Sequence, residues 1–419
     1  MSADPITAVV ERNLCTGCGG CAGAFPNAIR MLEDPVHGRR PVVARSDEGR
    51  AASKAAMAIC SGAYSDWSQL PIRDQTDADW GPILSTWEGW AADPEIRLKG
   101  SSGGAVTALA AFALHFGQVD GVAHVVARRD DPRLNEAVIS HDRVGLMRGT
   151  GSRYAQASPA ELVGEITRGA DQVAFIGKPC DVASVRRATE QDNELAAKIP
   201  LTIAIFCAGA PNLMATDRLL DRLEVPKDGD LIELRYRGNG WPGLMQATWR
   251  DEAGVEHLSK GIPYAEGWGT ILQGERRWRC NICADHTGAF ADISVGDPWH
   301  APPKGDLDAG RSLIVARTTK GRALVEAAIR AGVLIAEPRS RNVIEDAQPN
   351  LKKTHGAAWG RIAAMRVVGL QTPHLKGQRL WSLWLRLSTK QKLLSVLGTW
   401  KRILRNRLWR NVTIARIGL

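Results

Sequence analysis

The chain has 419 residues, enough for two or three domains, and its apolar content of 44% can build real cores, which excludes an intrinsically disordered protein. The start, MSADPITAVVERN, lacks the basic and apolar regions of a secretory signal, and no run of 18 apolar residues predicts a membrane span. We therefore expect a cytoplasmic protein, in which eight cysteines indicate metal or redox chemistry before disulfides.

Charge is distributed unevenly along the chain. The sequence has 54 Lys and Arg and 45 Asp and Glu, a formal net charge of +9. After Asp346 there are 15 basic residues and no acidic residue, so residues 1–346 carry 39 basic and 45 acidic side chains. A mildly acidic body is therefore followed by a strongly basic tail.

Residues 1–67 are predicted to form a ferredoxin-like iron–sulfur module. The stretch CTGCGGC has the C-x2-C-x2-C spacing of bacterial ferredoxins, but Phe25 stands where the fourth cysteine would precede Pro26. In two-cluster ferredoxins that fourth cysteine binds the other cluster, so its loss suggests one [4Fe–4S] cluster with a remote fourth ligand. The next cysteine, Cys60, is predicted to be that ligand. The three cysteines of the run are Cys15, Cys18 and Cys21.

Residues 68–94 are rich in Pro, Asp, Gly and Trp without a sustained period, which predicts a linker. Strand and helix patterns then alternate to about residue 344, which predicts an α/β body. The whole chain is expected to be mixed α+β. We divide this body into an N-terminal part, 95–165, and a C-terminal part, 166–344. The predicted strands are 119–128, 173–177, 201–207, 290–297 and 311–317, and the predicted helices are 104–117, one that starts at Asp181, and 319–333.

A second set of four cysteines lies in the C-terminal part of the body. Cys180 and Cys207 each follow a predicted strand, and side chains at the carboxyl ends of strands gather at one edge of an open α/β sheet. Cys280 and Cys283 form a C-x2-C unit. Four thiolates suit a [4Fe–4S] cluster or a structural zinc ion, and a further interpretation makes Cys180 and Cys207 inert core residues.

Two loops of small residues are candidate anion sites. The first, KGSSGG at 99–104, leads into a predicted helix, whose N–H groups and dipole attract anions. The second, GTGSRYAQASP at 149–159, offers Arg153 and Tyr154 as phosphate and ring contacts. Neither loop matches an established nucleotide-binding pattern, so an ordinary helix start and a surface loop are the alternative interpretations.

Together these stretches resemble the family of coenzyme F420 hydrogenase/dehydrogenase beta subunits. The matching segments follow the family's order over about residues 97–330: KGSSGGAVTAL, GSRYAQAS, FIGKPCDVASVR, IAIFCAG, CNICAD, ADISVGDPW and SLIVART-TKGRALVE. The resemblance implies a flavoprotein, with FAD as the expected flavin, connected to iron–sulfur clusters. It also makes coenzyme F420 a candidate substrate.

The residues expected at these sites follow from the spacing and the resemblance together. Two [4Fe–4S] clusters are expected, with ligands Cys15, Cys18, Cys21 and Cys60 for one and Cys180, Cys207, Cys280 and Cys283 for the other. The expected cofactor-binding residues are Lys99, Ser101, Ser102, Gly103, Gly104, Ser152, Arg153, Tyr154 and Lys178. Lys178 replaces the Thr or Val frequent in the family and would place a cation near the flavin or substrate.

No single catalytic residue emerges from the sequence. A reduced organic substrate needs an acid to protonate it, and several polar residues lie in the cysteine-adjacent motifs. The candidates are Lys178, Asp181 and His286, with Asp285, Asp297 and His300 in the same motifs. For the Asp and His residues a cap or turn role is the alternative, and for Asp297 we favour a turn role.

Residues 345–419 are predicted to form a basic helical tail. Apolar residues recur at helical spacing within 376–410 with Lys and Arg between them, which is typical of an amphipathic helix lying on an anionic membrane surface. The alternative is a helix packed on the body or on a partner. Nucleic acid is not expected, because no base-reading motif accompanies the charge.

Three functions fit these features. The first is an iron–sulfur flavoprotein oxidoreductase that passes electrons between a ferredoxin-type donor and an organic substrate or deazaflavin. The second is an electron-transfer beta subunit of a larger hydrogenase or dehydrogenase complex, without a substrate of its own. The third is a zinc-stabilised binding protein without redox function. The expected partners are a ferredoxin or a dehydrogenase subunit, a second copy of the chain, and the inner face of the membrane through residues 376–419.

Overall fold

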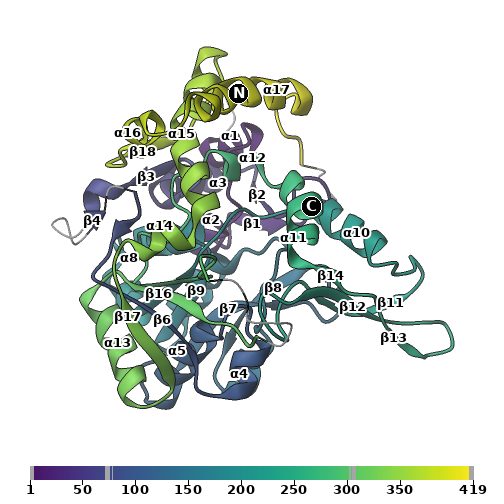
Figure 1. Cartoon of the computed structure of the whole chain (residues 1–419). Coiled ribbons are helices and arrows are strands. Elements are labelled where there is room, and N and C mark those ends of the chain that lie inside the picture. The colour runs from purple at the N-terminus through teal and green to yellow at the C-terminus, as the bar shows by residue number, and fades with distance from the viewer. Residues whose placement is uncertain (1–3, 71–75, 78, 302, 304–307, 415–419) are drawn as a thin grey trace.

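A mixed eight-stranded sheet forms the centre of the molecule, in a computed structural model that describes residues 4–70, 76–77, 79–301, 303 and 308–414 (Figure 1). The strand order is β17-β6-β16-β15-β10-β9-β7-β8, and β15, β10, β9 and β7 are parallel neighbours. This architecture confirms the predicted α/β class. The strands are β6 (Ser85–Ala91), β7 (Gly121–Ala127), β8 (Asn135–Ser140), β9 (Val173–Gly177), β10 (Leu201–Ile205), β15 (Ile293–Gly296), β16 (Ser312–Ala316) and β17 (Leu334–Arg339).

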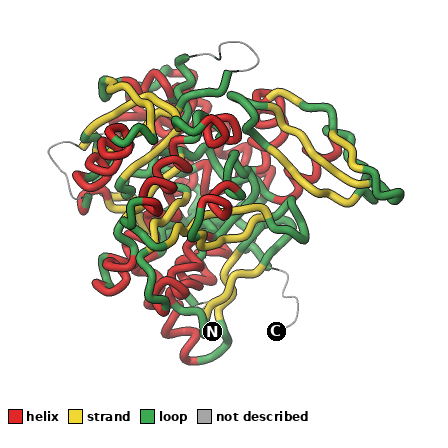
Figure 2. Tube along the Cα trace, turned by 90° about the horizontal axis from the view of Figure 1, so that it is seen from below, coloured by secondary structure: helices red, strands yellow, loops and turns green. Residues whose placement is uncertain are grey.

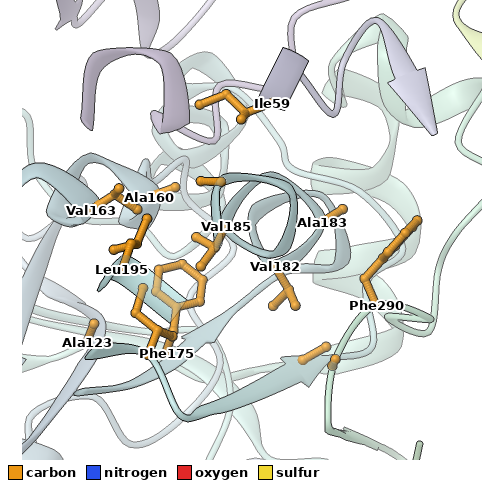
Figure 3. Packing of buried hydrophobic residues seen from close by; sticks show 14 of the residues in the cluster. Ile59, Ala123, Ala160, Val163, Phe175, Val182, Ala183, Val185, Leu195 and Phe290 are labelled. Atoms are coloured by element: carbon orange, nitrogen blue, oxygen red, sulfur yellow. The ribbon is translucent and has the colours of Figure 1, made fainter. Parts of the chain in front are cut away.

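Helices cover both faces of this sheet, which explains why its parallel strands are nearly continuous apolar runs. On one face Phe175 of β9 packs with Val182 and Val185 of α8 (Figure 3). On the other face Leu109 and Val325 pack with strand residues that include Ile203 and Ile293. The helices of the first face are α7 (Val163–Arg168), α8 (Pro179–Thr189) and α9 (Asn193–Lys198), and those of the second are α5 (Ala105–His115) and α13 (Thr319–Arg330).

A smaller antiparallel sheet projects from one side of the body (Figures 1 and 2). It packs against α10 around Leu219, Tyr236, Met245 and Trp268. Its importance for the site is that the segments after its strands carry aromatic and basic residues toward the carboxyl edge of the main sheet. Its elements are β11 (Asp230–Arg235), β12 (Leu244–Arg250), β13 (Glu256–Leu258), β14 (Ile262–Pro263), α10 (Leu213–Arg222) and α11 (Tyr264–Glu266).

The N-terminal residues form a module that packs on the outer side of α8. Figure 3 shows Ile59 of this module above α8, and its carbonyl accepts a hydrogen bond from Ser184 Oγ (3.0 Å). Arg187 of α8 donates to the carbonyls of Cys60 and Tyr64, both at 3.2 Å. The elements of the module are α1 (Pro5–Glu11), α2 (Gly20–Ala24), β1 (Ile29–Leu32), β2 (Arg40–Val43), α3 (Asp47–Ala56) and β3 (Tyr64–Asp66).

The linker prediction for 68–94 is wrong for its last third. Residues 85–91 form β6, an inner strand of the main sheet that pairs with both β16 and β17. The sequence STWEGWA has no clean alternation, and its neighbours in the sheet come from more than 200 residues further along the chain, so no local signal marks it. Residues 71–75 and 78 of the predicted linker lie outside the described residues.

The tail forms several helices that pack on the body in place of one amphipathic helix. Strand β18 pairs in parallel with β3 of the N-terminal module, and Ile362, Met365 and Ile403 share a core with Val9 and Leu14. None of the helices formed by the described residues combines the length and apolar character that crossing a membrane requires. The elements are α14 (Val343–Ala347), α15 (Pro349–Val367), β18 (His374–Lys376), α16 (Leu380–Leu385) and α17 (Thr389–Asn406).

Shortening Phe175 tests the packing between α8 and the sheet. Phe175 is fully buried, so Phe175→Ala leaves a cavity and should lower the free energy of unfolding by about 3–5 kcal/mol. Chemical denaturation monitored by circular dichroism measures this change. The control Val144→Ala, at a side chain 74% exposed, should change stability by less than about 0.5 kcal/mol. Equal effects of the two substitutions would contradict the packing described.

Candidate functional site

A cavity of about 280 Å³ lies where three parallel strands end. Lys178 follows β9, Cys207 follows β10, and Asp297 follows β15, and all three residues line this cavity. The carboxyl ends of parallel strands are where open α/β sheets bind ligands. We call this space the large cavity.

The KGSSGG loop forms one wall of the large cavity. Ser101, Ser102 and Gly104 line it, and Gly104 is the N-cap residue of α5 without a capping side chain. Gly103 and Gly104 have φ values of 91° and 74°, in the left-handed region that favours glycine. The loop therefore presents the N-terminus of an 11-residue helix to the cavity, as expected for an anion site.

Lys99 does not take part in this wall. It ends α4 (Pro94–Lys99), and its ammonium group donates to Glu95 Oε1 at 2.9 Å. Gly103 also lies outside the cavity lining, because it packs on the backbone of Arg311. A Cβ atom added to Gly103 would lie 2.7 Å from the Cα atom of Arg311.

The second predicted loop forms the adjoining wall. Ser152 Oγ donates to Ser101 Oγ at 2.8 Å, which joins the two loops. The Arg153 guanidinium donates to Asn135 Oδ1 (2.8 Å) and to the carbonyl of Leu234 (2.9 Å), so its contacts anchor the loop. Tyr154 also lines the cavity, and its ring lies 4.9 Å from that of Trp268.

An ion pair and an aromatic stack complete the large cavity. Arg237 donates two hydrogen bonds to Asp297, at 2.9 and 2.6 Å, and a third to the carbonyl of Ser101. Tyr264 and Trp299 stack with ring centroids 5.3 Å apart, and the Arg237 guanidinium lies 4.9 Å from the Tyr264 centroid. Sequence reasoning missed all of these residues except Asp297, for which it favoured a turn role.

Asp297 keeps the buried Arg237 charged. Burial by itself lowers the pKa of Arg237, but the attraction of the Asp297 carboxylate outweighs burial and raises that pKa overall. The large cavity therefore has a fixed cation–carboxylate pair beneath its aromatic wall.

A second, smaller cavity of about 50 Å³ lies beside the first. All four cysteines of the second set line it, as the sequence predicts. This space exceeds the roughly 10–15 Å³ that one water molecule needs, so it has room for a group larger than one ion. The four cysteines are Cys180, Cys207, Cys280 and Cys283, and we call their space the thiol cavity.

The two cavities share part of their walls. Lys178, Cys207, Gly209 and Ala210 line both of them. A group bound in one cavity would therefore be separated from a group in the other by little more than the Cys207 segment. The backbone N–H of Gly209 donates to Cys207 Sγ at 3.4 Å, the kind of bond that favours a thiolate.

The first set of cysteines also comes together. Burial raises the pKa of the Cys21 thiol, and its neighbours Cys18, Cys15 and Cys60 raise it further, so the four sulfurs lie within electrostatic range. The pKa of Cys180 is raised mainly by burial, with a small contribution from Cys18, so the two sets are neighbours. Among the described residues, no three His, Cys, Asp or Glu side chains lie close enough to hold a single metal ion.

Two of the catalytic candidates form a buried ion pair beside the thiols. Lys178 Nζ donates to Asp181 Oδ2 at 2.6 Å, and both residues line the large cavity. His286 lines the thiol cavity, where its Nδ1 bonds the Cys207 carbonyl at 2.9 Å. Its Nε2 is buried with no hydrogen-bond partner among the described groups.

The other two polar residues of these motifs have structural roles. Asp285 accepts hydrogen bonds from the backbone N–H groups of Thr287, Gly288 and Ala289, which confirms the turn interpretation. His300 pairs with Glu88 at 2.9 Å and lines neither cavity.

The Arg237–Asp297 pair provides a test of the large cavity's wall. Asp297→Ala would leave the Arg237 charge buried without a carboxylate, which should reduce stability by about 3–5 kcal/mol. Denaturant unfolding measures the change. The matched control is Asp230→Ala, which removes an exposed carboxylate 3.9 Å from Arg250 and should cost less than about 1 kcal/mol. A similar loss of stability in Asp297→Ala and Asp230→Ala would show that the buried pair is dispensable.

His124, in the wall of the large cavity, gives a prediction about pH. Burial, helped by the charge of Arg148, lowers its pKa to about 4, whereas the unfolded chain has a value near 6.5. Between these values the unfolded state binds a proton that the folded state does not, so stability should fall as pH falls from about 6.5 to 4. Thermal unfolding at several pH values should show that the His124→Gln variant, which can still bond Ser140, loses less stability as pH falls than the wild type does. Identical pH profiles would refute a neutral buried His124.

Comparison with known proteins places this chain in a family. Residues 86–163 match the N-terminal model, and residues 170–342 the C-terminal model, of the coenzyme F420 hydrogenase/dehydrogenase beta subunit. The beta subunit of coenzyme F420 hydrogenase from Methanosarcina barkeri is 24% identical over 65% of this chain and 86% of the relative. A component of the F(420)H(2) dehydrogenase from Methanosarcina mazei is 21% identical over 71% of this chain and 80% of the relative.

A solved structure supports the same fold. A chain of the F420-reducing [NiFe] hydrogenase complex from Methanosarcina barkeri aligns with a TM-score of 0.55 and 21% identity, covering 71% of this chain and 97% of that chain. The relatives are subunits of oxidoreductases. Since the two family models together match more than half of its residues, the chain belongs to the family of coenzyme F420 hydrogenase/dehydrogenase beta subunits.

Proposed function

We propose that the chain is an iron–sulfur flavoprotein that passes electrons between a ferredoxin-type donor, two [4Fe–4S] clusters, FAD, and an organic substrate or coenzyme F420. The observation that carries this proposal is the wall shared by the large cavity and the thiol cavity. A flavin exchanges electrons in pairs or singly and a cluster exchanges them singly, so the two groups must lie close together to work in sequence.

The residues present fit the two clusters. Each set of four cysteines is gathered in space, and the second set surrounds a cavity larger than one ion requires. Buried guanidinium groups fix the loops of the first set: Arg279 donates to the carbonyl of Gly62 at 2.9 Å, and Arg277 donates to that of Thr16. Buried cations beside the thiols would also offset the negative charge of thiolate-bound clusters.

The residues present also fit a flavin in the large cavity. Its volume, about 280 Å³, is just below the roughly 300–1,000 Å³ of most ligand sites and has room for the ring system of a flavin. The N-terminus of α5 offers N–H groups for a phosphate, and the stacked rings of Tyr264 and Trp299 offer an apolar surface for a ring system. Arg237 and Lys178 supply cations for polar groups at the ring edge.

Within this site Lys178 and Asp181 would control charge and protons. Lys178 lies between the two cavities, and Asp181 fixes its ammonium group through a 2.6 Å bond. We assign Lys178 to orienting the group in the large cavity and Asp181 to positioning Lys178. His286 lines the thiol cavity and is assigned to that cavity's wall.

A second candidate function is electron transfer within a larger complex. The relatives compared above belong to hydrogenases and dehydrogenases, which supports a dehydrogenase subunit as a partner of this chain. The large cavity suits both candidates, because each of them needs room for a flavin beside the thiols, so a substrate that binds next to the flavin would distinguish the enzyme. None of the eight cysteines, all of which lie in the described residues, forms a disulfide, which agrees with the proposed cytoplasmic location.

Metal and flavin content after strictly anaerobic purification test the proposal. We expect about eight iron atoms per chain, four for each cluster, and one flavin released by acid treatment. Cys283→Ala should lose about four irons and Cys60→Ala the other four, whereas the control Ser65→Ala, in the strand that follows Cys60, should keep all eight. Zinc in place of iron, with no visible absorption, would overturn the redox function and support a zinc-stabilised binding protein.

A further inference from the structure

Helix α17 is packed with its apolar side outward. Four of its leucines are more than half exposed: Leu393 (56%), Leu394 (57%), Leu397 (54%) and Leu404 (67%). The positions turned to the body are Ser395, Thr399 and Ile403, all buried. A helix that only covers its own core places its leucines inward, so packing on the body does not explain the outward leucines.

Specific bonds fix this orientation of α17. Trp384 Nε1 donates to Ser395 Oγ at 3.0 Å, and Trp400 Nε1 donates to the carbonyl of Ala364 in α15 at 3.0 Å. The helix begins with a capping box formed by Ser388 and Gln391. The leucines are therefore exposed in a firmly held helix.

Basic side chains lie among the leucines and at one edge of them. At 3.6 residues per turn, Lys390, Lys401 and Arg405 fall with the four leucines within roughly one third of the helix circumference. All three are exposed. We call these seven residues the outer face of α17: Lys390, Leu393, Leu394, Leu397, Lys401, Leu404 and Arg405.

Further exposed apolar residues lie at the same end of the molecule. Trp381 and Leu385 of α16 are 48% and 47% exposed, and Val367, at the end of α15, is 74% exposed. Figure 1 shows α16, α17 and the end of α15 together at the top of the molecule, away from α4 and α13. Exposed apolar residues grouped on neighbouring helices, rather than scattered singly, mark an interaction site.

We propose that the outer face of α17 docks on an anionic lipid bilayer, with the helix lying in the plane of the interface. The leucines would enter the boundary between headgroups and acyl chains, and the long cationic side chains would extend to lipid phosphates. Charge supports a lipid occupant: the chain after Asp346 has 15 basic residues and no acidic residue, which matches a uniformly negative surface. This docking is independent of the redox assignment, because none of the residues that carry it lines either cavity.

Flotation of the full-length protein with vesicles tests the proposal. The protein should float with vesicles of phosphatidylcholine and phosphatidylglycerol and remain at the bottom with phosphatidylcholine alone. The variant Leu393→Ser/Leu397→Ser/Leu404→Ser should lose flotation. Each of Lys390→Gln, Lys401→Gln and Arg405→Gln should weaken binding by about fivefold, and high salt should weaken it as well.

Controls separate docking from folding and from protein partners. The matched variant Val144→Ser/Val255→Ser/Leu258→Ser changes three equally exposed apolar residues elsewhere and should float like the wild type. Both triple variants should retain the wild-type circular dichroism spectrum. Flotation unaffected by the α17 serines would overturn the proposal. So would a protein that never floats but forms dimers that those serines abolish, because the face would then bind a second copy of the chain.

Discussion

Helix α8 is the element that holds the N-terminal module and the α/β body together. Its N-terminus places Lys178, Cys180 and Asp181 between the large cavity and the thiol cavity. Its inner side packs on the sheet through Val182 and Val185, while Ser184 and Arg187 bind the segment that carries Cys60. One buried helix thus fixes the distance between the two cysteine sets, so a shift of α8 would separate them.

The tail packs on the N-terminal module from the outside. Strand β18 extends the N-terminal module beside β3, and α15, α16 and α17 together supply about half of the buried residues in the core that contains Val9 and Leu14. The two sides of the tail differ: the inner side packs on the body, as one of the alternatives expected, and the outer face of α17 carries exposed leucines. A residue pattern indicates that a helix is amphipathic, but it does not indicate which side of the helix packs on the protein.

The parts of the site predicted from sequence are those with a local signal. The glycine loop before α5, the thiols after β9 and β10, and the Cys280–Cys283 unit each have a recognisable spacing, and the structure brings them to one edge of the sheet. Arg237 and the stacked rings had no such signal, because a buried arginine becomes recognisable only when its carboxylate, here Asp297, is found 60 positions away. Lys99 shows the converse case. Its position beside the loop suggested a cofactor contact, but in the structure its side chain bonds Glu95.

The sequence by itself determined the α/β class, five of the eight strands of the main sheet with helices α5, α8 and α13, and the division of the cysteines into two sets, because hydrophobic period and ligand spacing are local properties. Only the tertiary structure decided that β6 is an inner strand, that the two cavities share the Cys207 segment, and that α17 turns its leucines outward. The physical reason is that strand pairing, cavity walls and the buried side of a helix are set by contacts between residues far apart in the chain.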